Sequence, residues 1–362
     1  MKVLISVLCL LGGLLTAAPQ QPQTVSDMPE HESVGLPASA APAAGPAKNV
    51  IYMIGDGMGA EHLWAAWLCN HGKLNITQLP CTAFSCTVSA NQTITDSAAG
   101  GTALACGVKT NNTMLGQTPD GTARESLAEY FRQQGMATGL VVTKAITDAT
   151  PAAFYAHTPS RYNTSAIAHA LTVAGFDVAL GGGAAAFSPE QLAAMRESGA
   201  DVELFAPGDC PPASQRGDLL SRNVQRALKH LQNAPDGFFL MIEGSSIDLA
   251  AHERNLAETV REVLDFDRAV GVVLQWMAEH PGTLLVVTAD HQTGGLAILD
   301  GSAERGQVRA VFTTGKHSGV AVPVYAAGAG AGRFHGVIQN TQVAHLIKKS
   351  VASEAGDVLE NR

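Results

Sequence analysis

A serine next to a carboxylate opens a run of very small residues in the stretch TITDSAAGGTALACG, residues 93–107. Ser97 has no His within a few residues to act as its base, and a seryl hydroxyl alone is a poor nucleophile at neutral pH. A metal ion can do that job by coordinating the oxygen and favouring its alkoxide. The following Ala and Gly residues would let the first turn of a helix approach an anion with its backbone N–H groups. These residues alone leave open the alternative that Ser97 is an ordinary helix N-cap.

Several further residues that could bind cations stand directly after apolar segments. Each is, in isolation, more often a helix cap or a turn residue. Several carboxylates at one buried edge would repel one another and resist desolvation, so such a cluster requires cations. The residues are Asp56, Asp148, Thr150, Glu243, Asp290 and His291.

Asp248 and His252 stand four residues apart in EGSSIDLAAHERN, and His317 lies in GKHSG. On a helix the first two side chains share one face, where they could bind one metal ion or form an exposed ion pair. His with Asp suits zinc, whereas Glu243, Thr150 and Asp56 offer only oxygen, which magnesium prefers. We therefore expect more than one ion, and paired metals about 3.5–4 Å apart suit in-line displacement at phosphorus.

The elements that must position these residues are short apolar strands. Continuous hydrophobic runs occupy residues 49–55, 138–143, 176–182, 237–244, 283–290 and 320–328. Such runs are typical of strands buried on both faces of a mostly parallel sheet, and helical patterns separate them at residues 123–135 and 219–232. We predict an α/β fold, a three-layer α/β/α sandwich, rather than a barrel, which the uneven strand spacing disfavours. Ligands of such sheets bind beyond the carboxyl ends of the strands.

Composition bounds the function and the domain organisation. The chain has 362 residues, 23 Lys and Arg against 32 Asp and Glu, and no basic run, which argues against a nucleic-acid-binding surface. Residues 1–18 have the build of a cleavable signal peptide, which predicts a secreted or periplasmic protein. Residues 19–48 read as a flexible or loosely docked arm, 49–350 as a single catalytic domain and 351–362 as a tail. After the signal, no apolar segment is suited to a stable membrane span.

Cysteine usage is consistent with a compartment that permits disulfides. Removal of the signal leaves five cysteines, at positions 69, 81, 86, 106 and 210. The number is odd, so at least one thiol stays free. Cys81 and Cys86 could pair, although spacing alone does not decide it.

Six ordered blocks of this sequence resemble the alkaline phosphatase family. They extend from about Asn49 to the strand near Ala327, which is the great majority of the chain without its signal. The blocks are IGDGMG, TDSAAGGTALACGVKTNN, TDATPAAFYAHTPSR, IEGSSIDLAAH, TADHQTGG and GKHSG.

The resemblance implies a phosphomonoesterase with two zinc ions and one magnesium ion. Ser97 would be the nucleophile that forms a phosphoserine, and Arg161 would bind the phosphate. The resemblance assigns the ligands as follows: Asp248, His252 and His317 to the first zinc, Asp290 and His291 to the second, Asp56 between the second zinc and magnesium, and Thr150 with Glu243 to magnesium. Asp148 would reach magnesium through water. The family also implies a homodimer.

Two departures from the family pattern bear on this expectation. The position after the zinc-binding Asp is commonly Lys or His, and here it is Leu249, which removes a cation near the phosphate. Only 25 residues separate His291 from His317, where many relatives insert a surface subdomain. The alternatives are a phosphodiesterase or sulfatase on the same metal scaffold, or a protein that binds phosphate or metal without turnover.

Overall fold

A computed structural model describes residues 20–352. The expected signal peptide, residues 1–18, and nearly all of the expected tail, residues 351–362, lie outside the described residues. Within residues 20–352, no helix combines the length and the apolar character that a membrane crossing requires.

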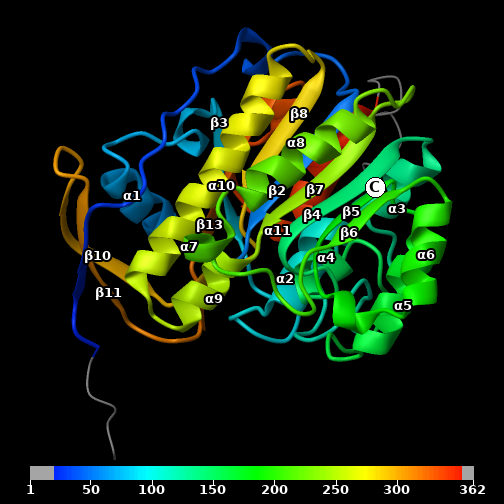
Figure 1. Cartoon of the computed structure of the whole chain (residues 1–362), viewed down its shortest axis with the longest axis horizontal. Coiled ribbons are helices and arrows are strands. Elements are labelled where there is room, and N and C mark those ends of the chain that lie inside the picture. The colour runs from blue at the N-terminus through cyan, green and yellow to red at the C-terminus, as the bar shows by residue number, and fades with distance from the viewer. Residues whose placement is uncertain (1–19, 353–362) are drawn as a thin grey trace, which may run out of the picture.

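A nine-stranded sheet forms the centre of the molecule (Figure 1). Its order is β14-β3-β13-β8-β2-β7-β4-β5-β6. The bounds are β2 Asn49–Gly55, β3 Cys81–Cys86, β4 Ala137–Ala145, β5 Val178–Gly182, β6 Asp201–Leu204, β7 Phe238–Gly244, β8 Thr283–Thr288, β13 Val322–Gly328 and β14 Gly336–Gln339. All residues of β2, β7 and β8 are buried, as the continuous apolar runs predict.

Helices cover both faces of this sheet, which confirms the predicted three-layer α/β/α arrangement. One face packs against α1 Ala60–Cys69, α7 Ala213–Arg216, α8 Leu219–Leu231, α9 Ser246–His252 and α10 Leu256–Met277. The other packs against α2 Ser97–Cys106, α3 Leu127–Gln133, α4 Ala149–Ala152, α5 Thr164–Ala174, α6 Pro189–Glu197 and α11 Asn340–Val351. Figure 1 shows α8 and α10 lying across the sheet toward the viewer.

The strand directions differ from the expectation at one side of the sheet. The pairs from β8 through β2, β7, β4 and β5 to β6 are parallel, but β13 runs antiparallel to both β8 and β3. The apolar run at 320–328 predicts a buried strand and carries no information about its direction. The sequence analysis also missed β3, β6 and β14, which are short and lie toward the two edges.

The arm before Asn49, which we expected to be flexible or loosely docked, contacts the domain at several points. Strand β1 Gln23–Val25 joins β11 Gln307–Phe312 and β10 Leu296–Ser302 in a small antiparallel sheet. Val25, Met28 and Ala40 are buried, and they contribute to the core that packs under α1 and α10. The Pro- and Ala-rich composition gave no indication of these buried apolar residues, which attach this part of the arm to the domain.

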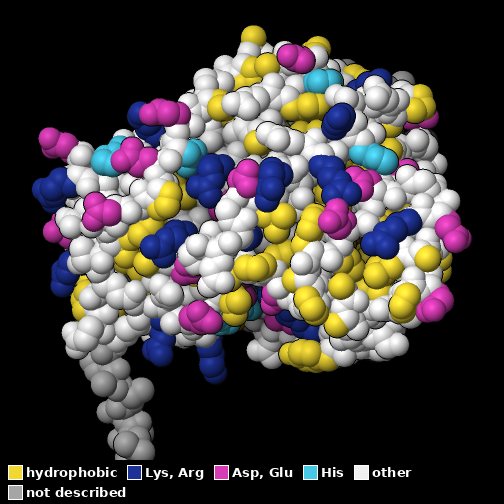
Figure 2. Space-filling view, viewed as in Figure 1, with side chains coloured by type: hydrophobic (Ala, Val, Ile, Leu, Met, Phe, Trp, Pro, Cys, Tyr) yellow, Lys and Arg dark blue, Asp and Glu magenta, His cyan; other side chains and the backbone are white. Residues whose placement is uncertain are grey.

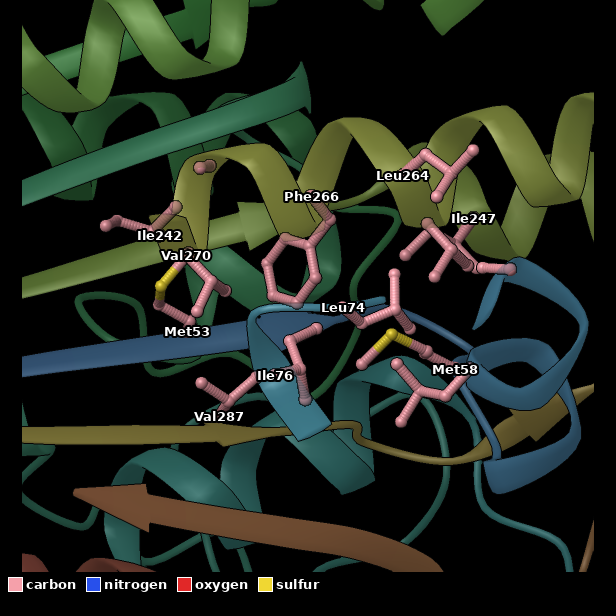
Figure 3. Close-up of a cluster of buried hydrophobic side chains, with 14 of the residues drawn as sticks. Met53, Met58, Leu74, Ile76, Ile242, Ile247, Leu264, Phe266, Val270 and Val287 are labelled. Carbon is pink, nitrogen blue, oxygen red and sulfur yellow. The ribbon is translucent and has the colours of Figure 1, made fainter. Parts of the chain in front are cut away.

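A hydrophobic cluster joins α9 and α10 to the central strands (Figure 3). Phe266 of α10 points toward Met53 of β2 and lies among Leu74, Ile76 and Val270. Ile247 of α9 is fully buried at the same cluster. Burial of such a side chain contributes roughly 1.5–3 kcal/mol. This packing fixes the backbone of α9, and with it the neighbouring Asp248.

The surface and the cysteines agree with an acidic, thiol-containing protein. On the face that Figure 2 presents, basic and acidic side chains are interspersed over α8 and α10.

The five cysteines at 69, 81, 86, 106 and 210 all have free thiols in the structure. The possible pairing of Cys81 with Cys86 is therefore not present, and the two residues occupy opposite ends of β3.

Candidate active site

Ser97 is the first residue of α2 at the carboxyl edge of the sheet, and it is almost fully buried. The cap of this helix is Asp96, whose Oδ1 accepts a hydrogen bond from the Ala99 backbone N–H at 3.0 Å. The N-cap alternative for Ser97 is therefore wrong, and its hydroxyl is not used to cap the helix. Ser97 Oγ lies 3.2 Å from His291 Nε2.

Asp56, Asp290 and His291 form one buried group of potential metal ligands. Asp56 follows β2, and the other two residues follow β8, which is paired with β2. His291 Nε2 lies 3.1 Å from Asp290 Oδ2 and 3.6 Å from Asp56 Oδ1. The other oxygen of Asp290 accepts hydrogen bonds from the backbone N–H groups of Gly57 and His291. The carboxylate is thus oriented with one oxygen toward the group.

Asp248, His252 and His317 form a second group. The two histidines use Nδ1 to donate to backbone carbonyls, His252 to Gly315 at 2.8 Å and His317 to Thr95 at 2.9 Å. In a neutral imidazole the other nitrogen then carries a lone pair. The two Nε2 atoms lie only 3.1 Å apart, and Asp248 Oδ1 is 3.3 and 3.5 Å from them. Such an arrangement suits a divalent cation.

Glu243 lies at the carboxyl end of β7, and Thr150 lies in α4, which follows the neighbouring strand β4. Both residues are buried. Within residues 20–352, Thr150 Oγ1 and Glu243 Oε2 find no hydrogen-bond partner, and neither does Asp56 Oδ1 nor Asp290 Oδ2. Buried polar oxygens without partners are costly, so these four atoms together mark a place where cations fit.

The electrostatics of these groups indicate the same deficit of positive charge. Burial, with nearby carboxylates, raises the pKa of Asp290 to about 6 and that of Glu243 to about 8. Burial and the charges of Asp290 and Asp248 raise the pKa of Asp56 well above its usual value. Burial lowers the pKa of His291. Divalent ions would reverse these tendencies, because they favour ionised carboxylates and neutral imidazoles.

Arg161 is held between two carboxylates beside this edge. Its guanidinium donates to Asp148 Oδ1 at 3.0 Å and lies 3.5 Å from Asp96 Oδ2. Asp148 also caps α4 through the Ala149 N–H and forms an ion pair with Lys144 at 2.5 Å. Although burial raises the pKa of Asp148, Lys144 and Arg161 together lower it.

Sequence reasoning missed three side chains of this site. Asp96 lies beside Arg161, Lys144 pairs with Asp148, and Thr293 joins the two ligand groups. Thr293 Oγ1 donates to Asp248 Oδ1 at 2.5 Å and lies 3.3 Å from His291 Nδ1. The two-stranded pairing of β9 Gln292–Thr293 with β12 His317–Ser318 places it there. Of these three residues, only Thr293 could have been suspected from the sequence, because it lies two residues after His291.

Comparisons with known proteins show which family this chain resembles. Alkaline phosphatase 3 of Bacillus subtilis (strain 168) is 34% identical over 289 residues, which are 69% of this chain and 62% of that protein. Alkaline phosphatase 4 of the same organism is 31% identical over 83% of this chain and 88% of that protein. The structure of alkaline phosphatase from the Antarctic bacterium TAB5 is similar, with a TM-score of 0.79 and 32% identity over 85% of this chain and 99% of that one.

The family model described as alkaline phosphatase matches residues 47–202 and 201–309. The matched segments include every candidate ligand except His317, together with Ser97 and Arg161. With these matches, the chain belongs to the alkaline phosphatase family.

Proposed function

We propose that this protein hydrolyses phosphate monoesters through a covalent phosphoserine at Ser97. The observation that carries the proposal is the position of Ser97, whose buried hydroxyl lies 3.2 Å from a member of one ligand group. The second group is joined to the first through Thr293. A nucleophile at two adjacent cation sites is the arrangement that phosphoryl transfer requires.

The residues fit two zinc ions and one magnesium ion. Asp248, His252 and His317 would hold the first zinc, and Asp290 with His291 the second. Asp56 would bridge to magnesium, which Thr150 and Glu243 would bind and Asp148 would approach through water. This donor chemistry is mixed nitrogen and oxygen at the first two sites and oxygen only at the third. A variant of TAB5 alkaline phosphatase with Mg bound in its M3 site is 31% identical to this chain, which supports the third ion.

When bound, the divalent ions would supply the Lewis acidity that lowers the pKa of a coordinated hydroxyl and stabilises charge on phosphoryl oxygens. Ser97 Oγ loses its proton and attacks phosphorus, the ester P–O bond breaks, and the alcohol leaves with a proton. Water then attacks the phosphoserine, the P–Oγ bond breaks, and Ser97 recovers a proton as phosphate departs. Arg161 binds two equatorial oxygens with its guanidinium fork.

Phosphate monoesters are the proposed substrate class because the site offers several positive groups to one phosphoryl unit. A dianionic monoester has one more charge to neutralise than a diester, and Arg161 with a third ion provides for it. Rates on p-nitrophenyl phosphate and bis-p-nitrophenyl phosphate separate this proposal from a phosphodiesterase. A higher kcat/KM on the diester would defeat it, and p-nitrophenyl sulfate tests the sulfatase alternative.

Substitution of the nucleophile tests the mechanism. Ser97→Ala, supplied with zinc and magnesium, should lose turnover of p-nitrophenyl phosphate by at least ~10⁴-fold, because removing a covalent nucleophile affects the whole catalytic unit. Ser89, which is half-buried and hydrogen-bonds only within its own turn, provides the control, and Ser89→Ala should keep wild-type rates. Acid quench with radiolabelled phosphate should trap phosphoserine in the wild type only. Metal-bound wild-type protein without turnover would instead favour a binding protein.

We further propose that residues 1–18 are removed on secretion and that the mature protein is a homodimer. Both statements depend on the sequence pattern and the family resemblance. N-terminal sequencing of protein recovered outside the cytoplasm tests the first, with cleavage near Ala18 expected. Light scattering of the purified mature chain tests the second.

A further inference from the structure

The residue after Asp248 is Leu249, where the family commonly has a cation. Its side chain lies on α9 and is 43% exposed. A leucine provides no charge to phosphate, so the site has lost a positive group from this helix. Lys144 provides a positive group from a different element, the end of β4.

Lys144 and Arg161 bind the same carboxylate from opposite sides. Lys144 Nζ is 2.5 Å from Asp148 Oδ2, and Arg161 donates to Asp148 Oδ1 at 3.0 Å. The Lys144 side chain is 15% exposed and that of Arg161 is 18% exposed, so both charges are partly shielded from water. Asp148 itself is anchored to the first N–H of α4. The orientation of Arg161 therefore depends on a carboxylate that Lys144 also holds.

Lys144 and Arg161 line one cavity, and Asp148, which both of them bind, lies in its wall between them and the candidate magnesium site proposed above. The cavity has a volume of about 520 Å³, and Lys144, Asp148, Arg161 and Tyr162 contribute to its wall together with Asp209. An anion in this cavity meets Lys144 and Arg161 together.

The charge of Lys144 is also close to the candidate metal ligands. Burial works to lower the pKa of Lys144, but the carboxylates of Asp148, Asp56 and Asp248 outweigh it and raise the pKa. The side chain therefore stays a cation near these carboxylates.

We propose that Lys144 is a positioning residue that replaces the cation missing at Leu249: it holds Asp148 so that Arg161 faces phosphate, and its own charge favours phosphate binding. This inference rests on the proposed function, because it assigns Lys144 to the same site. Under this proposal, phosphate affinity depends on Lys144, a residue outside the family motifs quoted above.

The test measures binding of inorganic phosphate to the zinc- and magnesium-loaded protein by isothermal titration calorimetry. Lys144→Met should weaken phosphate binding about tenfold, the size expected for one charged and partly exposed contact. KM for p-nitrophenyl phosphate should rise in proportion, with kcat changed less than about threefold, as for loss of uniform binding. Lys144→Arg should restore most of the affinity. Lys73→Met, which removes an exposed lysine paired with Glu32, is the control for net charge.

Leu249→Lys provides the decisive second variant. Introduced into Lys144→Met, it should recover at least half of the lost affinity on a logarithmic scale, and it should gain less in the wild type, because the two cations serve one function. Unchanged phosphate affinity in Lys144→Met would overturn the inference. Weakened affinity that neither Lys144→Arg nor Leu249→Lys restores would also overturn it, because shape rather than charge would then matter. If Lys144→Met does not bind metals, the polar Lys144→Gln takes its place, and unchanged phosphate affinity in that variant overturns the inference. Wild-type protein that binds phosphate but does not turn over esters would refute the proposed function and not this inference.

Discussion

Two regions of this molecule bury several charged side chains, and they differ in how those charges are satisfied. Between α7 and α10, Arg216 donates to Glu262 at 2.8 and 2.5 Å and to Asp265 at 2.7 and 3.1 Å. All three side chains are at most 1% exposed. Arg268 binds the remaining oxygen of Asp265, and the Ala213 N–H binds Glu262. This cluster is complete with protein groups alone.

The carboxyl edge of the sheet buries a comparable set of carboxylates without such partners. One oxygen of each of Asp56, Glu243 and Asp290 remains unpaired among the described residues. Cations are present nearby in Lys144 and Arg161, but both are bound to Asp148. A buried cluster that the protein neutralises itself is structural, whereas one left with unpaired oxygens is organised for something that binds.

Removal of divalent ions should therefore give the largest difference between the two regions, because only the carboxyl edge of the sheet depends on them. Dialysis against a chelator should reduce turnover of p-nitrophenyl phosphate by at least ~10⁴-fold, because activation of Ser97 depends on the ions. Zinc and magnesium together should restore it, with metal content followed by mass spectrometry. Full activity in protein shown to be free of metal would contradict the comparison.

The second prediction concerns the Arg216 cluster. Glu262→Ala should lower the free energy of unfolding by about 3–5 kcal/mol, because it leaves Arg216 buried with one partner fewer. Urea unfolding with and without chelator measures it, and the loss should be the same in both conditions. Asp218→Ala breaks an exposed pair with Arg222 and should cost about 0.5 kcal/mol or less. A loss for Glu262→Ala that disappears on chelation would link this cluster to the metals.

The sequence contained enough to predict the fold class and where the site lies. Strands buried on both faces, such as β2 and β7, appear as continuous apolar runs, and the observed bounds fall within two residues of those predicted. Parallel strands place their carboxyl ends together, so Asp56, Glu243 and Asp290 could be expected at one edge. Strand direction is not encoded in such runs, which is why antiparallel β13 was not foreseen.

The rest of the site depends on packing that no local pattern describes. Thr293 reaches Asp248 because β9 pairs with β12, across a connection that includes the β10–β11 hairpin. Lys144 lies at a strand end and resembles any solvated lysine until Asp148 is placed beside it. Arg161 stands in a loop, and only the family resemblance drew attention to it.

The third prediction uses pH to probe the unpaired carboxylates. Burial raises the pKa of Glu243 from 4.5 to about 8, so the metal-free folded protein retains a proton that the unfolded chain has lost. Stability of the metal-free protein should therefore fall as pH rises from 6.5 to 8, by about 2 kcal/mol from this group. His291, whose pKa is lowered by burial, opposes this change only weakly, because its imidazole in the unfolded chain is already about half deprotonated at pH 6.5.

Urea unfolding across this pH range measures the effect. Glu243→Gln should remove the part of this decline that comes from residue 243 in the metal-free protein, because the glutamine side chain does not titrate. Bound ions should also remove the decline, since they keep the carboxylate ionised. An equal decline in metal-loaded protein would show that the titration occurs elsewhere.

The smallest expected effect comes from a single methyl group between helix α2 and the ligand group that contains Asp290. A Cβ at Gly100 would lie 3.1 Å from the carbonyl oxygen of Asp290 and 3.2 Å from its Cβ, so Asp290 must move by a few tenths of an ångström. Alanine adds roughly 1 kcal/mol of helix propensity, which should offset most of the crowding. We therefore expect Gly100→Ala to change the free energy of unfolding by less than about 1 kcal/mol while kcat/KM falls about tenfold, because Asp290 and Ser97 shift relative to each other.

Gly332→Ala, whose Cβ would meet no atom within 4 Å, should leave kcat/KM unchanged. A large loss of stability with unaltered kinetics would mean that the contact between Gly100 and Asp290 supports only the fold. Gly100 would then be a structural residue, like the Arg216 cluster, and not a part of the ligand site.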